Sequence, residues 1–254
     1  MPAMDQFDPR LIGEVIQQHG VTRINCAPSM FHALLEQHRR GESWPALESL
    51  KTVFLGGEPV NLERLRSWVQ SAGCQAQVVN TYGPTECTDI ASYYVIQSSD
   101  FNSDAPLPIG RPIDNVQIFV LDQSLNPVPV GSPGELCIAG CGVGLGYWQD
   151  KEKSDRVFVS NPFASNPHDR LYRSGDIVVW RTDGQLLYRG RVDNQIKLRG
   201  LRIEAGEIET LLQQQEEVRQ ALVLVRSGRL VAYLESDHDT LDLAQIKSRL
   251  AISL

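Results

Sequence analysis

The sequence predicts an α/β protein with mixed sheets and helices, followed by a β-rich section and a small α+β unit. Stretches with helical apolar spacing alternate with short apolar runs over residues 8–79, which indicates helices between strands. Glycine-containing turns follow these strand-like runs. From Leu171 onward, hairpin signals such as Thr182-Asp183-Gly184 replace the helices.

The chain opens with a helix and continues as alternating strands and helices. Asp8 caps the first helix, Pro9 takes its first position and Gly20 ends it. Its apolar face carries Ile12, Val15, Ile16 and His19. We expect strands over residues 21–26, 50–55 and 74–79, with helices over 27–35 and 62–69. This alternation predicts a mostly parallel sheet, which is incomplete because no strand precedes the first helix.

The second half of the chain is predicted to be richer in strands, expected over residues 91–97, 115–122, 135–139, 177–181, 186–189, 221–225 and 230–234. A helix follows Glu204, and a last helix begins at Leu243. The glycines of Gly140–Gly146 form a loop that ends in Tyr147-Trp148. No Lys-Ser/Thr pair follows them, so a turn packed under aromatic rings is favoured over a phosphate-binding loop.

Composition limits the classes of function. At 254 residues, 42% hydrophobic and 22% charged, the chain can form one large globular domain or two smaller ones. A net charge of −7 argues against nucleic-acid and anionic-membrane partners. No apolar run is long enough to span a membrane, and the amino terminus does not resemble a signal peptide. The five dispersed cysteines lack zinc spacing, which favours reduced thiols in the cytoplasm.

The segment from Asn80 to Glu86, Asn-Thr-Tyr-Gly-Pro-Thr-Glu, combines several groups that bind nucleotides. It follows a predicted strand, and the carboxyl ends of strands in α/β sheets are where nucleotide sites form. An aromatic ring can stack on a base, a hydroxyl can contact a phosphate oxygen and a carboxylate can hold Mg²⁺. The alternative is a polar turn between two strands.

Three motifs in order identify a family resemblance. Asn80 to Glu86, Tyr172 to Asp176 and Gly190 to Glu209 together resemble the adenylate-forming (AMP-binding) superfamily. They are most similar to the amino-acid adenylation domains of non-ribosomal peptide synthetases (NRPSs), which make secondary metabolites. Acyl-CoA synthetases are the nearest relatives, but their segment usually carries a lysine where this chain has Asp193. That difference favours the amino-acid-activating branch.

The resemblance implies a two-step reaction with ATP and Mg²⁺. An amino-acid carboxylate attacks the α-phosphorus of ATP, pyrophosphate leaves, and the aminoacyl-adenylate passes to a phosphopantetheine thiol. The partners implied are a peptidyl carrier protein (PCP), which bears that thiol, and condensation domains of the same synthetase. Such chemistry depends mainly on positioning and on stabilising charge.

The resemblance also implies the ATP site. Tyr82 is expected to stack on adenine, Asp176 to accept both ribose hydroxyls, and Tyr188 and Arg191 to flank the nucleotide. Thr85 would contact phosphate oxygens and Glu86 would hold Mg²⁺, which makes both catalytic. The remaining expected members of the ATP site are Gly57, Glu58, Pro59, Asn80, Thr81 and Gly83. Taken singly, Asp176 could be a solvated turn acid, Glu86 a helix cap.

The implied positions for selecting the substrate side chain are Asn25, Phe54, Gly56, Thr81, Asp89 and Ile90. A carboxylate among apolar neighbours is costly unless it is paired. The hypothesis is therefore a polar or cationic substrate side chain that meets Asp89, assisted by Asn25 and Thr81. Asp89 could equally point outward. Cys87, beside Glu86, invites a nucleophile interpretation, but with no partnered base in sequence a packing residue is favoured.

The resemblance divides the chain into residues 1–192, the C-terminal part of the large AMP-binding domain, and 193–254, a truncated lid. Asp193 would be the hinge between them, and Lys197 a catalytic residue of the thioester-forming state. Lys197 could equally lie on a solvated strand face. The family's phosphate loop and its C-terminal lysine lie outside the sequence. We therefore expect a segment cut at both ends that is inactive when isolated, with exposed apolar surface.

Two other interpretations remain open at this level. The chain could be a non-catalytic nucleotide-binding remnant, or it could be a segment of an acyl-CoA synthetase. ATP binding without turnover would support the first, and activation of a fatty acid would support the second.

Overall fold

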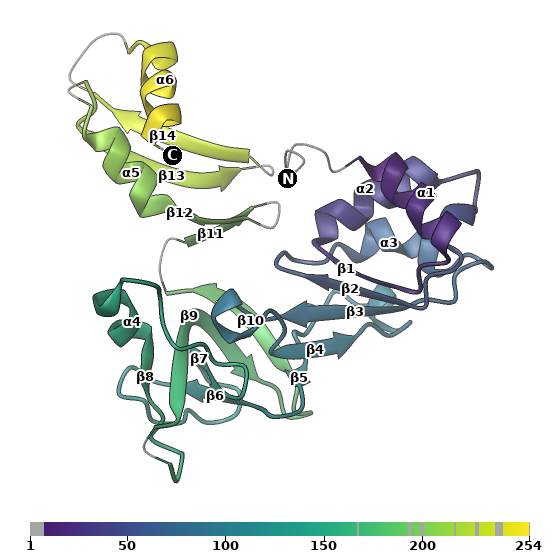
Figure 1. The fold of residues 1–254 in the computed structure, drawn as a ribbon, viewed down its shortest axis with the longest axis horizontal. Coiled ribbons are helices and arrows are strands. Elements are labelled where there is room, and N and C mark those ends of the chain that lie inside the picture. Colours follow the sequence, from purple (N-terminus) through teal and green to yellow (C-terminus); the bar gives the residue numbers. More distant parts are fainter. Residues whose placement is uncertain are drawn as a thin grey trace. The chain divides into compact units, whose positions relative to one another are not determined.

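The chain divides into two compact units, residues 1–192 and 193–254 (Figure 1). The computed structural model describes residues 8–166, 168–192, 195–198, 201–215, 217–226, 229–236 and 241–253. The division falls where the motifs suggest a hinge. Whether the two units are the large domain and the lid stays a prediction.

A mixed five-stranded sheet begins the first unit. Its order is β1 (Arg23–Cys26), β2 (Thr52–Gly56), β3 (Gln77–Tyr82), β4 (Ser92–Val95) and β5 (Arg111–Pro112). The first three strands are parallel, as the strand–helix alternation predicts, whereas β4 and β5 join antiparallel. The sheet is therefore mixed, because the connections after β3 contain no crossover α-helix.

Three helices lie on one side of this sheet: α1 (Pro9–His19), α2 (Pro28–His38) and α3 (Leu62–Val69) (Figure 1). The Asp8 side chain accepts from the Arg10 N–H and caps α1, and Gly20 ends the helix in the left-handed region, as predicted. Phe31 and Trp68 meet edge-on in the core, with ring centroids 5.0 Å apart. Val15 is 49% exposed, so the predicted apolar face of α1 is narrower than expected.

The rest of the first unit is an antiparallel sheet in the order β10-β9-β7-β6. The strands are β6 (Val116–Leu121), β7 (Pro133–Gly140), β9 (Arg170–Trp180) and β10 (Leu186–Arg191); β8 (Phe158–Ser160) pairs with β9 after α4 (Lys151–Val157). Tyr172 to Asp176 lie inside β9, not ahead of a strand as predicted. These polar residues fit within a strand because neighbouring strands satisfy their hydrogen bonds.

Short 3₁₀ turns complete this unit at Pro45–Leu47, Thr85–Cys87 and Asp100–Asn102. Its two sheets share a core. The cluster that contains Tyr82 of β3 and Ala91, just before β4, also contains Leu136, Val178 and Leu186 from the antiparallel sheet. The Ile109 N–H donates to the Leu186 carbonyl at 2.9 Å, which joins the two sheets at that edge.

The second unit pairs two hairpins with two helices. Its elements are β11 (Gln195–Leu198), β12 (Leu201–Glu204), α5 (Ala205–Gln213), β13 (Gln220–Arg226), β14 (Arg229–Glu235) and α6 (Leu243–Ser253). Ile208 and Leu212 of α5 pack with Val223 and with Ile246 of α6. The helix and strands expected after Glu204 are therefore present, with their apolar faces in one small core.

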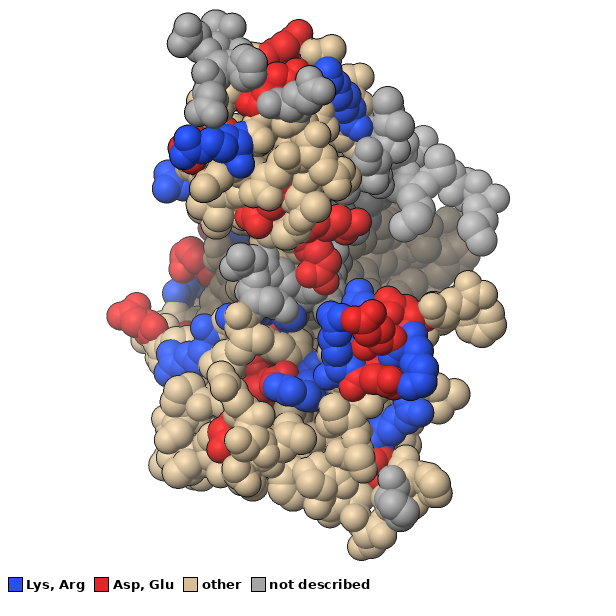
Figure 2. All heavy atoms as spheres, turned by 90° about the vertical axis from the view of Figure 1, so that its left-hand side faces the viewer, with Lys and Arg blue, Asp and Glu red and all other residues tan. Residues whose placement is uncertain are grey.

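Acidic and basic side chains are interspersed on the face drawn in Figure 2. Helix α4 shows the pattern at residue level, since Lys151 pairs with Asp155 and Arg156 pairs with Glu152 one turn apart. Such exposed pairs contribute little to stability. Among the described residues, no helix is both long enough and apolar enough to cross a membrane.

The turn after β3 requires a glycine at position 83. A Cβ atom there would lie 2.1 Å from the Asp89 carbonyl oxygen and 2.6 Å from the Ala91 nitrogen. Both atoms belong to the backbone, so neither can rotate away. Gly83 therefore allows the strand exit to fold back against residues 89–91.

Replacing this glycine should cost far more than replacing one in open space. Gly83→Ala is expected to destabilise the fold by roughly 3 kcal/mol, because a backbone segment must move. Gly20→Ala is the matched control, because nothing lies within 4 Å of its added Cβ and only its φ of 58° opposes the change. This substitution should cost about 1 kcal/mol. Urea unfolding would measure both, and equal costs would contradict the close approach at Gly83.

Candidate functional site

A buried carboxylate is the centre of the candidate site. Asp176 on β9 is 2% exposed, and the Arg191 Nη1 atom donates to its Oδ1 at 2.8 Å. The Tyr188 hydroxyl donates to the same oxygen at 3.3 Å, and the Tyr82 hydroxyl donates to Oδ2. The structure thus brings together four predicted members of the ATP site, from β3, β9 and β10.

Tyr82 connects this carboxylate to the mixed sheet. Its ring is 6% exposed and lies 6.5 Å from that of Tyr188, measured between centroids. Burial, followed by the adjacent Asp176 charge, raises the pKa of Tyr82 well above its usual value. The phenol therefore stays protonated and serves as a donor. Stacking of Tyr82 on an adenine ring stays a prediction.

A second carboxylate supports the strand that carries Asp176. Glu135 on β7 accepts from Arg173 through Oε2, at 2.6 Å, and from the Gly175 N–H through Oε1, at 3.1 Å. The pairing of β7 with β9 shifts register next to Glu135, and Gly175 has a φ of 70°. Ser174 adds two further bonds: its hydroxyl donates to the Leu136 carbonyl and accepts from the Asp176 N–H. These contacts fix the irregular backbone beside Asp176.

Thr85 and Glu86 lie on the short 3₁₀ turn that follows β3, with Thr85 exposed. The Tyr147 hydroxyl donates to Glu86 Oε1 at 2.5 Å. The glycine-rich loop also contacts the turn, because the Gly144 N–H donates to the Glu86 carbonyl at 2.8 Å. Gly140–Gly146 is therefore a structural loop, as the sequence favours, and it packs on the predicted metal-binding residue.

Gly57, Glu58 and Pro59 follow β2 next to the end of β3, but the Glu58 side chain has a structural partner. Its Oε2 accepts from the Ser29 N–H at 3.1 Å, in the first turn of α2. That helix has no side-chain cap of its own. Glu58 Oε1 is buried without a hydrogen-bond partner. Asn80 is also engaged, since its Nδ2 donates to the Pro108 carbonyl at 2.7 Å.

Strand register places the predicted substrate residues on one face of the mixed sheet. Asn25 pairs with Phe54, and Gly56 pairs with Thr81. Because side chains alternate along a strand and paired residues share a face, these four residues lie together. Asp89, at a φ of 70°, accepts from Asn25 Nδ2 through Oδ2 at 3.0 Å and joins them.

The backbones of β2 and β3 lie close together at this group. A Cβ atom on Gly56 would lie 2.5 Å from Thr81 Oγ1, so a larger residue there would displace the Thr81 hydroxyl. Ile90 is half-buried next to Asp89. Asp89 itself is exposed, so water as well as the Asn25 amide solvates its carboxylate, and the apolar surroundings expected for it are not found. Selection of the substrate by these residues stays a prediction.

Two further predicted residues lie in or next to the second unit. Asp193, the predicted hinge, is outside the described residues. Lys197 lies in strand β11, opposite Arg202 of β12, so its backbone belongs to a hairpin rather than to a loop. Its part in the thioester-forming step stays a prediction.

Cys87 is a packing residue, as the sequence favours. It is 2% exposed in the core shared by the two sheets. Burial, followed by the nearby Glu86 charge, raises the pKa of its thiol from 9.0 to about 12. A nucleophilic cysteine needs the opposite shift, because the thiolate is the reactive form.

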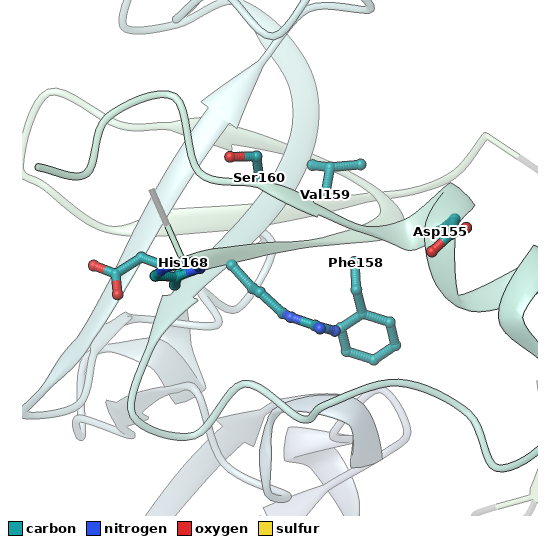
Figure 3. Close-up of a pocket in the computed structure, with 7 residues that line it drawn as sticks. Asp155, Phe158, Val159, Ser160 and His168 are labelled. Carbon is teal, nitrogen blue, oxygen red and sulfur yellow. The ribbon is translucent and has the colours of Figure 1, made fainter. Parts of the chain in front are cut away.

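A separate pocket lies beside α4, β8 and the start of β9 (Figure 3). Its volume is about 250 Å³, and its lining residues are Asp155, Phe158, Val159, Ser160, His168, Asp169 and Arg170. None of them belongs to the predicted site. Its charged side chains are of both signs, so they define no particular ligand.

Comparison with known proteins supports the resemblance. Tyrocidine synthase 3 of Brevibacillus parabrevis is 37% identical over 250 residues, or 96% of this chain and 4% of that protein. Malpibaldin synthetase of Mortierella alpina is 42% identical over 234 residues, or 91% and 4%. An artificially fused adenylation-PCP di-domain NRPS from Klebsiella oxytoca superposes with a TM-score of 0.78 at 30% identity, covering 99% of this chain and 45% of that chain.

The shared fold and the order of the motifs define the class as adenylate-forming. The AMP-binding enzyme family matches residues 1–148, and the chain belongs to that family. The predicted fold class and the resemblance to NRPS adenylation domains are confirmed. The chain spans 4% of the two synthetases and less than half of the solved di-domain.

Sequence reasoning missed the residues that support the site. From the sequence, Tyr147 is recognisable only as the end of a glycine-rich loop, and Glu135 only as the start of a strand. Each bonds a residue at least 38 positions away. The single local signal was the glycine-rich loop itself, which indicates close packing but names no partner.

Removing the cation from the buried pair should strongly destabilise the first unit. Arg191→Met is expected to cost about 3–5 kcal/mol, because the Asp176 charge stays buried without its cation. Arg181→Met is the matched control, since its pair with Asp183 has the same 2.8 Å separation but the two side chains are 40% and 48% exposed. Loss of this exposed pair should cost about 0–1 kcal/mol. Urea unfolding would compare them, and similar losses would refute a central role for the buried pair.

Proposed function

We propose that this chain is part of an adenylation domain that activates an amino acid with ATP and transfers it to a carrier-protein thiol. The observation that carries the proposal is the buried Asp176 carboxylate with its three donors, Tyr82, Tyr188 and Arg191. Tyr82, Asp176 and Arg191 come from the three motifs, in the order that the family resemblance requires. Similarity to peptide synthetases supports this function over the acyl-CoA alternative.

The residues present fit a nucleotide. Asp176 has two acceptor oxygens, which match the two hydroxyls of a ribose. Because Asp176 is 2% exposed, bound ribose would have to displace a tyrosine hydroxyl from that carboxylate, while Arg191 keeps its charge balanced. Thr85 is exposed and directly precedes Glu86 in the sequence, and it offers a hydroxyl to phosphate oxygens.

The residues also fit Mg²⁺. This ion is typically held by one or two carboxylates together with substrate phosphates and water. Glu86 supplies one such carboxylate, and the described residues contain no group of three or more His, Cys, Asp or Glu that could form a cage. Bound Mg²⁺ would offset the charge that develops on the phosphates during transfer.

The reaction then proceeds in two balanced steps. A carboxylate oxygen of the amino acid forms a bond to the α-phosphorus while the bond to pyrophosphate breaks. In the second step the phosphopantetheine thiol gives its proton to solvent and its sulfur bonds to the carbonyl carbon, while the bond from that carbon to the AMP oxygen breaks and AMP leaves. Lys197 would act in the second step, after rotation at Asp193. The carrier and condensation domains of the same synthetase would be the partners, and the cytoplasm the location.

Nucleotide binding should depend on Asp176. In the complete domain that carries this chain, Asp176→Asn is expected to raise the KM for ATP in amino-acid-dependent ATP–pyrophosphate exchange by roughly 10-fold or more, through loss of charged hydrogen bonds. Asp183→Asn, in the exposed turn between β9 and β10, is the control and should leave the KM unchanged. Unchanged exchange in Asp176→Asn, with the fold checked by circular dichroism, would refute the assignment.

Substrate choice should depend on Asp89. Because Asp89 accepts from Asn25 on the face that carries Phe54 and Thr81, a polar or cationic substrate side chain can meet it there. Asp89→Ala is expected to change the ranking of amino acids in the exchange assay, by roughly 10-fold or more for the preferred one. An unchanged ranking would exclude Asp89 from the pocket.

A further inference from the structure

The glycine-rich loop holds Glu86 at two points. The Gly144 N–H bonds the Glu86 carbonyl at 2.8 Å, and the Tyr147 hydroxyl bonds the side-chain Oε1 at 2.5 Å. The first contact fixes the backbone of the turn, and the second fixes the orientation of the carboxylate. Thr88, two residues on, adds a third connection, because its hydroxyl donates to the Gly142 carbonyl at 2.8 Å.

Tyr147 is itself held from three sides. Its N–H donates to Ser154 Oγ at 2.8 Å. Its ring meets Phe158 edge-on, at 5.6 Å between centroids, and Lys153 Nζ lies 4.9 Å from the ring centre. These contacts come from α4 and β8, elements that the antiparallel sheet supports. These contacts hold the Tyr147 side chain in one position, so its hydroxyl can fix the orientation of Glu86, as a residue that supports a site must.

We propose that Tyr147 is a positioning residue that holds the Glu86 carboxylate in the orientation in which it binds the metal of Mg–ATP. The inference rests on the proposed function and extends it to a residue outside the motifs. A carboxylate has two oxygens and about four lone-pair sites, so it can accept the Tyr147 hydroxyl and ligate a cation together. Hydrogen-bond partners of metal ligands fix the orientation of those ligands and thereby the metal affinity.

The test measures metal binding directly, in the complete adenylation domain that carries this chain. Tyr147→Phe removes one hydroxyl and keeps the ring contacts with Phe158 and Lys153. Electron paramagnetic resonance with Mn²⁺ in place of Mg²⁺ would give the metal affinity in the presence of ATP. We expect the affinity to fall roughly 10-fold, with the affinity for AMP in a metal chelator unchanged.

Tyr94 offers a matched control. Its hydroxyl also donates to a carboxylate, that of Asp100, at 3.0 and 3.1 Å, and neither residue belongs to the candidate site. Tyr94→Phe should leave both affinities unchanged. If Tyr147→Phe lowers the melting temperature more than Tyr94→Phe does, the ratio of the two affinities still separates the effects, since misfolding would weaken both.

The outcomes are distinct. A selective loss of Mn²⁺ affinity supports the positioning role. Equal Mn²⁺ affinity in Tyr147→Phe and in the unaltered domain overturns it, and so does a parallel loss of Mn²⁺ and AMP affinity, which marks a purely structural contact. An unaltered domain that binds neither Mn²⁺–ATP nor AMP would overturn the proposed function itself, and the inference with it.

Discussion

The first unit depends on satisfying one buried charge. Taking a carboxylate out of water costs several kcal/mol unless a cation and hydrogen-bond donors meet it. At Asp176 those groups come from two sheets: Arg191 and Tyr188 lie on the neighbouring strand, and Tyr82 lies 94 positions earlier in the chain. The end of β3 must therefore approach β9, and the apolar core around Tyr82 fills the space between the sheets.

The strand that carries Asp176 shows how polar residues are accommodated inside a sheet. Ser174 and Asp176 are almost fully buried, yet their polar atoms have partners on β7 and β10. Glu135 compensates the register shift by accepting from Gly175 and Arg173. A polar network of this kind fixes one arrangement of strands, because any slip would leave a buried charge without its partner.

The two-residue period of the strands separates core from site in the mixed sheet. Val53, Leu55 and Val78 face the helices, and the alternate positions carry Asn25, Phe54, Gly56 and Thr81. The helix-facing core and the predicted substrate residues thus lie on opposite faces of the same three strands. The glycine-rich loop contacts Glu86 in two ways. The Gly144 N–H bonds the Glu86 carbonyl, and the hydroxyl of Tyr147, at the end of the loop, bonds the Glu86 carboxylate.

Local physics in the sequence determined most of the elements: the caps of α1, the parallel strands β1 to β3, the turn at Gly83 and the motifs that define the family. These follow from short-range rules of periodicity, capping and turn chemistry. Only the tertiary structure decided which strands make the sheet mixed, namely β4 and β5. It also decided that Tyr172 to Asp176 lie inside a strand, and that Glu86, Glu58 and Glu135 find partners in Tyr147, Ser29 and Arg173. Those partners are 29 to 61 positions apart in the chain. They meet because burial of apolar surface brings the strands together, and that long-range packing leaves no local signature.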